Sequence, residues 1–266
     1  MLGRKFVIND YLSPYQSSKL KASLYSFFNE HKPLGTSVPP GYHFAYYNPQ
    51  TFEGELSKDG YDSYQQPQDD TFRRRMWVGG QMDFIKPLEL GKESQCNETI
   101  TRFRRLKDNF FVDISREMVQ DGEIRFKELR QLIYTNHTFD PANSVTKIAS
   151  ERPTHTHQLT PTEILLFRYS ALTFNPHKIH YNKEYSQREG YPDLLVHGPL
   201  MVTLLLEWAT SMYAGLKVQS FKYKNSSPAF VNQPLRLCQS GSDAQMKLWI
   251  ENSQGFIVTE GLLTSS

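Results

Sequence analysis

The chain has 266 residues, 30 basic and 28 acidic side chains, a formal net charge of +2 and 38% hydrophobic residues. A chain of this length buries a core of its own, as one large domain or two modest ones. The charges are too evenly balanced to indicate a nucleic-acid partner, and the longest apolar stretch, residues 194–208, is too short and too interrupted for a membrane span.

The N-terminal segment, residues 1–28, carries four basic side chains against one acidic side chain and lacks the apolar core of a secretory signal. This composition permits a mitochondrial transit peptide. Two cysteines far apart, Cys96 and Cys238, exclude a disulfide-stapled scaffold and fit a reducing compartment. From Pro33 to Asp70 many turn-forming residues and tyrosines predict a long irregular segment.

The next part of the chain has the pattern of long antiparallel strands. Strand-like runs cover residues 77–85, 93–103, 110–119 and 123–134. Asp121 and Gly122 separate the last two runs and favour a two-residue hairpin turn, because both tolerate positive φ. A proline-containing stretch, 135–161, then predicts a linker. We therefore expect one unit over residues 1–150, with an irregular N-terminal extension, and a second over 151–266.

The second unit begins with a helix signal. Thr160 as N-cap, Pro161 at the first position and Glu163 as the capping-box partner predict a helix over 164–172. A second helix, 199–214, is apolar nearly all round and must be buried on most sides. Strand-like runs follow at 218–223, 235–239, 245–250 and 256–263. The order indicates an α+β fold in which an antiparallel sheet wraps round a central helix.

Two stretches carry the chemical signal: FRYSALTFNPHKIH at 167–180 and YPDLLVHGPL at 191–200. They resemble the hydratase-2 or MaoC-type motif of the hot-dog superfamily, in which a Ser-Gly-Asp-x-Asn-Pro-x-His run precedes a His-Gly step into the central helix. The resemblance is closer still to the fungal mitochondrial 3-hydroxyacyl-thioester dehydratases of type II fatty-acid synthesis. RMWVGGQMDFIKPLELG at 75–91 is similar to the N-terminal hot-dog unit of that subfamily, so the likeness covers roughly residues 73–266.

The resemblance implies a tandem hot-dog fold whose first unit is non-catalytic. It implies reversible dehydration of (3R)-3-hydroxyacyl thioesters in mitochondria, on an acyl carrier protein or coenzyme A, without a cofactor. Two units in one chain leave a monomer and a homodimer both open.

The motif departs from the general pattern at its acidic position. A gapless alignment puts Asn175 in the place of the aspartate and His180 in that of the histidine. Alignment on Asn-Pro would instead put Thr173 there and require a two-residue insertion. We prefer the gapless alignment, which the subfamily resemblance also implies.

Loss of water from a 3-hydroxyacyl thioester needs a base for the α-proton, a group that handles the hydroxyl, and donors for the charge on the thioester oxygen. His180 is the expected base, since much of an ordinary imidazole is neutral at cellular pH. Asn175 is expected to position the hydroxyl or water. The backbone N–H of Gly198, at the start of the buried helix, is the expected oxyanion donor. The candidate substrate-binding residues are Thr173, Tyr181, His197 and Pro199, with ordinary packing the simpler interpretation for Tyr181.

The missing carboxylate leaves the acid open. His180 could return the proton that it has taken, or Glu184 or Glu189 could serve, and the sequence does not rank them. His155, His157, His177 and His180 also offer four imidazoles to a metal. We expect no metal site, because the first pair lies in the linker.

Basic clusters at Arg73–Arg75 and at 102–107 are most simply solvated faces. Their functional interpretation is recognition of an acidic carrier protein or of the phosphates of coenzyme A. Two alternative functions stay open: hydration of a short dicarboxylic acyl-CoA, which would need a buried arginine, and thioester binding without turnover.

Overall fold

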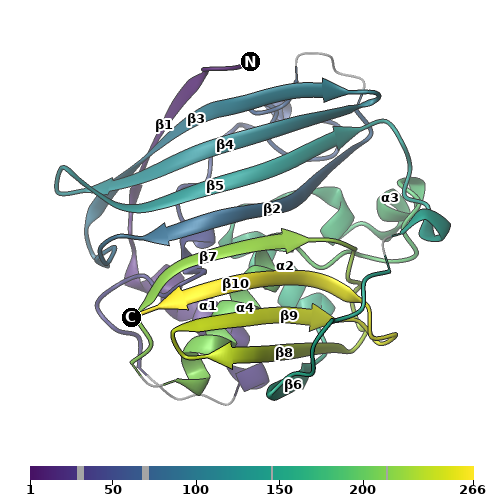
Figure 1. Ribbon diagram of the computed structural model, residues 1–266. Helices are drawn as coiled ribbons and strands as arrows, with labels where there is room; N and C mark the ends of the chain where they lie inside the picture. Colours follow the sequence, from purple (N-terminus) through teal and green to yellow (C-terminus); the bar gives the residue numbers. More distant parts are fainter. Residues whose placement is uncertain (29–32, 68–71, 145, 214) are drawn as a thin grey trace.

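The computed structural model describes residues 1–28, 33–67, 72–144, 146–213 and 215–266. Ten strands form one antiparallel sheet in the order β1-β3-β4-β5-β2-β7-β10-β9-β8-β6, with the main helices on one side of it (Figure 1). The strands are β1 (Lys5–Tyr11), β2 (Arg74–Phe84), β3 (Glu93–Leu106), β4 (Asn109–Gln120), β5 (Glu123–Thr135), β6 (His155–Leu159), β7 (Val218–Asn225), β8 (Leu235–Ser242), β9 (Gln245–Glu251) and β10 (Ile257–Ser265). The α-helices are α1 (Pro14–Phe28), α2 (Glu163–Leu172), α3 (Lys183–Arg188) and α4 (Gly198–Met212).

The two halves of the sheet have the same topology. β1 to β5 are ordered 1-3-4-5-2 and β6 to β10 are ordered 6-8-9-10-7, so each half inserts its helices between its first and second strands. The halves join where β2 pairs with β7. A Cβ on Gly79 would approach the Tyr223 carbonyl oxygen of β7 to 2.8 Å, and one on Gly80 would approach the Leu129 carbonyl oxygen of β5 to 2.3 Å, so β2 packs too closely for side chains at these two positions. The expected change of unit near residue 150 falls between β5 and β6.

The predicted buried helix is α4. Every residue from Leu200 to Ala209 is buried, which confirms a helix surrounded on most sides. It ends at Met212; the predicted end, Ala214, lies outside the described residues.

The start predicted for α2 is wrong by two residues. The N-cap is Thr162, whose hydroxyl accepts a hydrogen bond from the Leu165 N–H at 3.1 Å, and not Thr160. Glu163 is therefore the first helical residue rather than the capping-box partner. The predicted extent of the helix is otherwise confirmed.

The N-terminal segment belongs to the folded sheet. β1 pairs with β3 along its length, from Lys5 with Thr99 to Tyr11 with Glu93, and α1 buries Leu20 and Leu24 in the main core. The sequence had offered this segment as an irregular extension or transit peptide. Its strand signal is weak because β1 is an edge strand on which exposed and half-buried residues alternate.

The segment predicted to be irregular, Pro33 to Asp70, is irregular over residues 33–67, as predicted. Its last residues, Asp70 among them, lie outside the described part of the chain. It packs against the sheet: Tyr42 lies in the short 3₁₀ helix η1 (Tyr42–Ala45), and both Tyr42 and Tyr47 are fully buried. This segment therefore contributes buried aromatic side chains to the main core, which both halves share.

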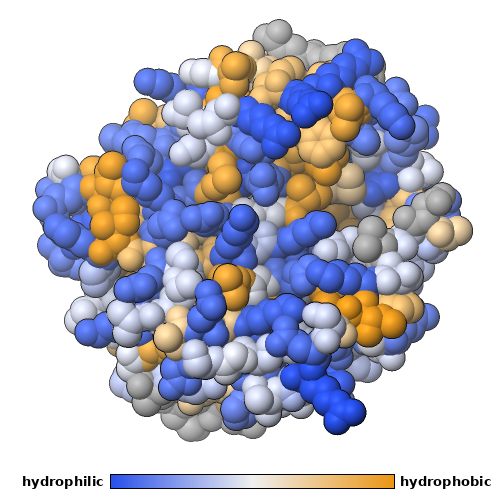
Figure 2. Space-filling view, viewed as in Figure 1, coloured by the Kyte–Doolittle hydropathy of each residue, from blue (hydrophilic) through white to orange (hydrophobic). Residues whose placement is uncertain are grey.

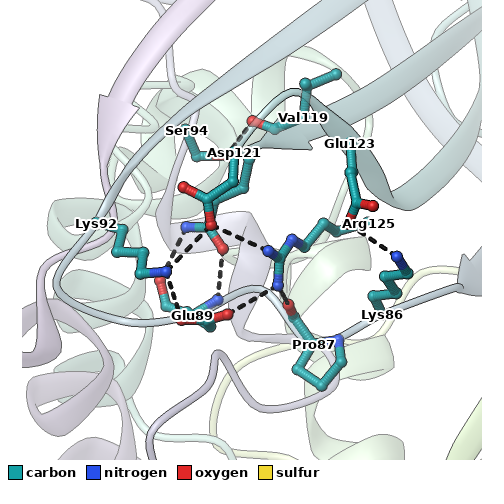
Figure 3. Close-up of polar contacts among 10 residues, drawn as sticks. Lys86, Pro87, Glu89, Lys92, Ser94, Val119, Asp121, Glu123 and Arg125 are labelled. Carbon is teal, nitrogen blue, oxygen red and sulfur yellow. Dashed lines mark hydrogen bonds and ion pairs between the residues drawn. The ribbon is translucent and has the colours of Figure 1, made fainter.

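The predicted hairpin turn is confirmed, since Asp121 and Gly122 have φ values of 54° and 75°. Arg125 forms ion pairs at 3.0 Å with Asp121 and at 2.9 Å with Glu89, which ties the β4–β5 turn to the β2–β3 loop (Figure 3). Because the carboxylates are partly exposed, these pairs fix the turn more than they stabilise the fold.

The face of the sheet opposite the helices carries mostly hydrophilic side chains, and its hydrophobic groups form separate patches (Figure 2). Within the described ranges, no helix has the length and apolar character needed to cross a membrane.

Candidate active site

A cavity of about 720 Å³ takes its walls from both halves of the chain. The start of β2 and part of β5 contribute Trp77 and Leu132 among others, and the second half contributes η4 (Lys178–His180) and the first turn of α4. The volume is in the usual range for small-molecule sites, and the site has both apolar and polar walls.

His180 lies in this cavity wall, and one of its ring nitrogens is hydrogen-bonded within the protein. Its side chain is buried, with the residue 7% exposed, and Nδ1 lies 2.9 Å from the Leu195 carbonyl oxygen. A carbonyl oxygen only accepts, so Nδ1 carries the hydrogen and Nε2 keeps its lone pair. Burial, with a smaller effect of His177, lowers the His180 pKa to about 3. The ring is therefore a neutral acceptor throughout the cellular pH range.

His197 supports His180 from behind. The two rings stack with centroids 3.6 Å apart and an interplanar angle of 22°. His197 is fully buried, its Nε2 lies 2.8 Å from the Ser170 hydroxyl oxygen, and it does not line the cavity. The structure therefore places this predicted substrate contact behind the base, where it restricts the orientation of the His180 ring.

Asn175 lies in the same wall, and its amide orientation follows from its partner. Oδ1 accepts a hydrogen bond from the His177 backbone N–H at 3.0 Å. Because Oδ1 has this partner, the Nδ2 donors are the part of the amide left for a ligand hydroxyl.

His177 is a lining residue that sequence reasoning considered only as a metal ligand. Its Nε2 lies 3.5 Å from Asp59 Oδ2, and its ring stands edge-on to His180 with centroids 5.6 Å apart. Burial lowers its pKa to about 4, although Asp59 acts in the opposite direction. Asp59 comes from the irregular first-half segment, so no local pattern in the sequence connects it with the motif.

Gly198 is the first residue of α4, and it also lines the cavity, as does Pro199. The N–H groups of the first helical turn have no acceptor within the helix and favour negative charge. A Cβ at Gly198 would approach Asn225 Nδ2 to 2.8 Å. The residue is therefore glycine where the backbone packs closely at the cavity wall.

We expect Gly198→Ala to lower turnover about tenfold or more, because the added methyl displaces the Asn225 amide and shifts the backbone donor. Gly54→Ala is the matched control, since a Cβ there meets no atom within 4 Å. Steady-state rates on an enoyl thioester check this, and equal rates for both variants would contradict the role of Gly198.

The structure brings His180, Asn175, Gly198 and Pro199 to one cavity and leaves three predicted residues outside it: His197, which lies behind His180, and Thr173 and Tyr181. The Thr173 hydroxyl donates to the Tyr169 carbonyl at 2.7 Å, which is a helix-end contact. Tyr181 is 51% exposed, and neither residue lines the cavity. Their predicted substrate contacts are therefore not supported by the geometry.

The candidate acids also lie elsewhere, because neither Glu184 nor Glu189 lines the cavity. The linker imidazoles lie on β6, where His155 Nδ1 contacts the Gln239 side chain and His157 Nε2 contacts the Phe27 carbonyl. Across the described residues no three potential metal ligands gather in one place.

One of the two basic clusters is not a solvated face. Arg73 is exposed, but Arg74 is buried, and Arg74 and Arg75 line the cavity. The arginines and lysine between 102 and 107 are exposed, as expected.

The sequence model of one family, described as hydroxyacyl-thioester dehydratase type 2, matches residues 41–231. The mitochondrial hydroxyacyl-thioester dehydratase type 2 of Schizosaccharomyces pombe is 34% identical over 94% of both chains. The Saccharomyces cerevisiae protein of the same name is 32% identical over 77% of both chains. Mesaconyl-C(4)-CoA hydratase of Chloroflexus aurantiacus is 30% identical over 82% of this chain and 80% of its own.

Solved structures show the same fold at low sequence identity. HtdX of Mycobacterium tuberculosis superposes with a TM-score of 0.75 at 14% identity, over 99% of this chain and 100% of its own. Another Mycobacterium tuberculosis protein, which has a double hot-dog fold, superposes with a TM-score of 0.60 at 10% identity, over 100% and 96% of the two chains. The predicted tandem hot-dog fold is confirmed. With the family match covering well over half of its length, the chain belongs to the hydroxyacyl-thioester dehydratase type 2 family.

Proposed function

We propose that the protein catalyses the reversible dehydration of (3R)-3-hydroxyacyl thioesters to trans-2-enoyl thioesters. The observation that carries this is the free Nε2 of His180, set by the bond from Nδ1 to Leu195, in the same cavity wall as the first-turn amide of Gly198. Family membership supports the reaction type.

In the dehydration direction His180 Nε2 removes the proton from C2, and the electrons of that C–H bond form the C2=C3 double bond as the C3–O bond breaks. The Gly198 N–H stabilises the charge that develops on the thioester oxygen. Asn175 Nδ2 donates to the hydroxyl and holds it in line. The proton on Nε2 then passes to the departing hydroxyl and releases water, so the imidazole is regenerated. One imidazole therefore acts as base and acid in turn, in a site where neither candidate glutamate takes part.

The setting of the reaction is part of the proposal. The first unit, residues 1–150, is non-catalytic and provides walls for the acyl chain, to which β2 contributes Trp77 and Val78. The thioester is carried by an acyl carrier protein or coenzyme A. The two named mitochondrial relatives support action in mitochondrial fatty-acid synthesis. The tandem units are compatible with a monomer or a homodimer.

The test is hydration of trans-2-enoyl-CoA by the purified protein, followed as the loss of enoyl absorbance. Formation of the (3R)-3-hydroxy product, identified by chiral chromatography, is the expected result. No loss of absorbance at micromolar enzyme, with the protein folded by circular dichroism, would contradict the proposed activity.

A second function is favoured by one feature of the cavity. Its walls include the buried Arg74, which suits an acyl chain that carries a second carboxylate. The similarity to mesaconyl-C(4)-CoA hydratase supports the same candidate. Relative rates on butenoyl-CoA and on its ω-carboxy counterpart distinguish the two functions.

We expect Asn175→Asp to keep activity within about tenfold of the wild type or to raise it, because an aspartate still accepts from the His177 N–H and adds a group that exchanges protons. Asn175→Ala, which loses both functions of the amide, should be far slower. The measurement is kcat on a 3-hydroxyacyl thioester. Complete loss in the aspartate variant with a native thermal transition would show that the reaction needs the amide itself.

A further inference from the structure

Arg74 occupies an unusual position at the start of β2. Its residue is 7% exposed, and it lines the cavity. Nη1 donates to the His137 carbonyl at 3.1 Å, Nη2 contacts Met76 Sδ at 3.0 Å, and the buried Nε has no hydrogen-bond partner. A guanidinium offers five N–H donors, so several of them are not used by the protein.

Two aromatic rings hold this guanidinium in place. Its central carbon lies 5.1 Å from the ring centroid of Tyr191 and 5.9 Å from that of Phe139, and those two rings stack on each other at 4.8 Å. Tyr191 and Phe139 also line the cavity. Stacking thus pre-positions the planar guanidinium fork of Arg74, which reduces the conformational entropy that the side chain loses when it binds a ligand.

The other arginines of the cavity differ because their charges are neutralised. Arg75 Nε lies 2.8 Å from Asp59 Oδ2, and Arg130 Nε lies 2.9 Å from Glu128 Oε1. Within the part of the chain that the structure describes, Arg74 forms no ion pair of this kind. A buried charge without a counterion is costly, and such a site gains most when a ligand brings the opposite charge.

Glu189 is a carboxyl whose pKa is affected by the charge of Arg74, but it is a poor counterion for that guanidinium. Burial raises its pKa to about 7, although Arg74 acts in the opposite direction, and its Oε1 has no hydrogen-bond partner. Near neutral pH part of this carboxyl is protonated, so it neutralises Arg74 only in part.

We propose that Arg74 is an anion-binding subsite that holds an oxyanion of the thioester substrate, either a phosphate of its carrier arm or a carboxylate at the end of its acyl chain. This rests on the proposed dehydratase function and adds to it a residue that selects the substrate. Both oxyanions match the planar fork in bidentate geometry.

Four small thioesters separate the two sources of the oxyanion. These are trans-2-butenoyl-CoA, its ω-carboxy counterpart, and the N-acetylcysteamine thioesters of the same two acids, which lack phosphate. For Arg74→Met we expect kcat/KM to fall at least about 30-fold on the thioesters that carry the recognised oxyanion and less than about threefold on the others. A phosphate site penalises both CoA thioesters; a carboxylate site penalises both ω-carboxy thioesters.

Two further variants sharpen the test. Arg73→Met removes the same charge from the exposed neighbouring residue and should leave all four rates unchanged. Arg74→Lys keeps the charge but not the fork, so we expect a smaller loss with the same selectivity; this variant also serves if Arg74→Met does not fold.

The outcomes that overturn the proposal are separate from those that overturn the function. Equal losses on all four thioesters, or no loss on any, would show that Arg74 binds no substrate oxyanion. Inactivity of the wild-type protein on all four would instead contradict the dehydratase function.

Discussion

His180→Ala is expected to reduce turnover of a 3-hydroxyacyl thioester by about 100-fold or more, as loss of a general base does. The remaining rate would come from binding and from the Gly198 amide. Because the ring stacks on His197, the truncation also leaves a void, so His180→Asn is the better-matched variant. The asparagine Nδ2 occupies the place of the imidazole Nδ1 and keeps the bond to the Leu195 carbonyl, while Nε2 is removed.

Single-turnover rates on a saturating thioester separate the chemical step from binding. We expect both His180 variants to lose kcat with little change in thermal midpoint for His180→Asn. His155→Ala, on the exposed imidazole of β6, is the control and should match the wild type. Wild-type kcat in His180→Asn would assign the base to another residue, with His177 the next imidazole in the same wall.

The local elements of the fold could be predicted because short-range physical rules determine them. The alternating strands, the Asp121–Gly122 turn and the apolar helix α4 depend on neighbours only a few residues away. By contrast, β1 could not be recognised, because an edge strand that stays half exposed has little hydrophobic pattern. The seam between β2 and β7 joins residues more than a hundred positions apart, and no local pattern reports that contact.

The same contrast between short-range sequence patterns and long-range contacts explains which residues of the site could be predicted from the sequence. His180, Asn175 and Gly198 lie in motifs that can be recognised as short strings, and they line one cavity. Asp59 and Arg74 come from the first half: Asp59 contacts the cavity residue His177, and Arg74 lines the cavity itself, in each case only through the packing of the two halves. Arg74 also illustrates that a run of three arginines does not indicate exposure, since Arg73 is exposed while Arg74 and Arg75 both line the cavity.

The protein should lose stability as the pH falls below about 6.5, the pKa of a histidine in the unfolded chain. His43, His177, His180 and His197 are buried, and burial lowers the pKa of each, to about 4 for His177 and about 3 for His180. Below pH 6.5 the unfolded chain binds protons that the folded protein does not. The contribution of the buried neutral rings to the free energy of unfolding is therefore fully present above that pH. It is lost progressively on acidification, by up to about 1.4 kcal/mol per pH unit for each ring.

Glu189 acts in the opposite sense. Its folded pKa of about 7 lies above the unfolded value, so the folded protein holds a proton that the unfolded chain releases between pH 4.5 and 7. His177 and His180 alone outweigh this one carboxyl, and His43 and His197 act in the same direction, so a net loss of stability remains between pH 7.5 and 5.5. Urea unfolding at these two pH values measures the difference, and calorimetry in two buffers of different ionisation enthalpy should detect a net uptake of protons on unfolding at pH 5.5. A free energy of unfolding that is equal at both pH values would mean that these rings are accessible to protons in the folded protein.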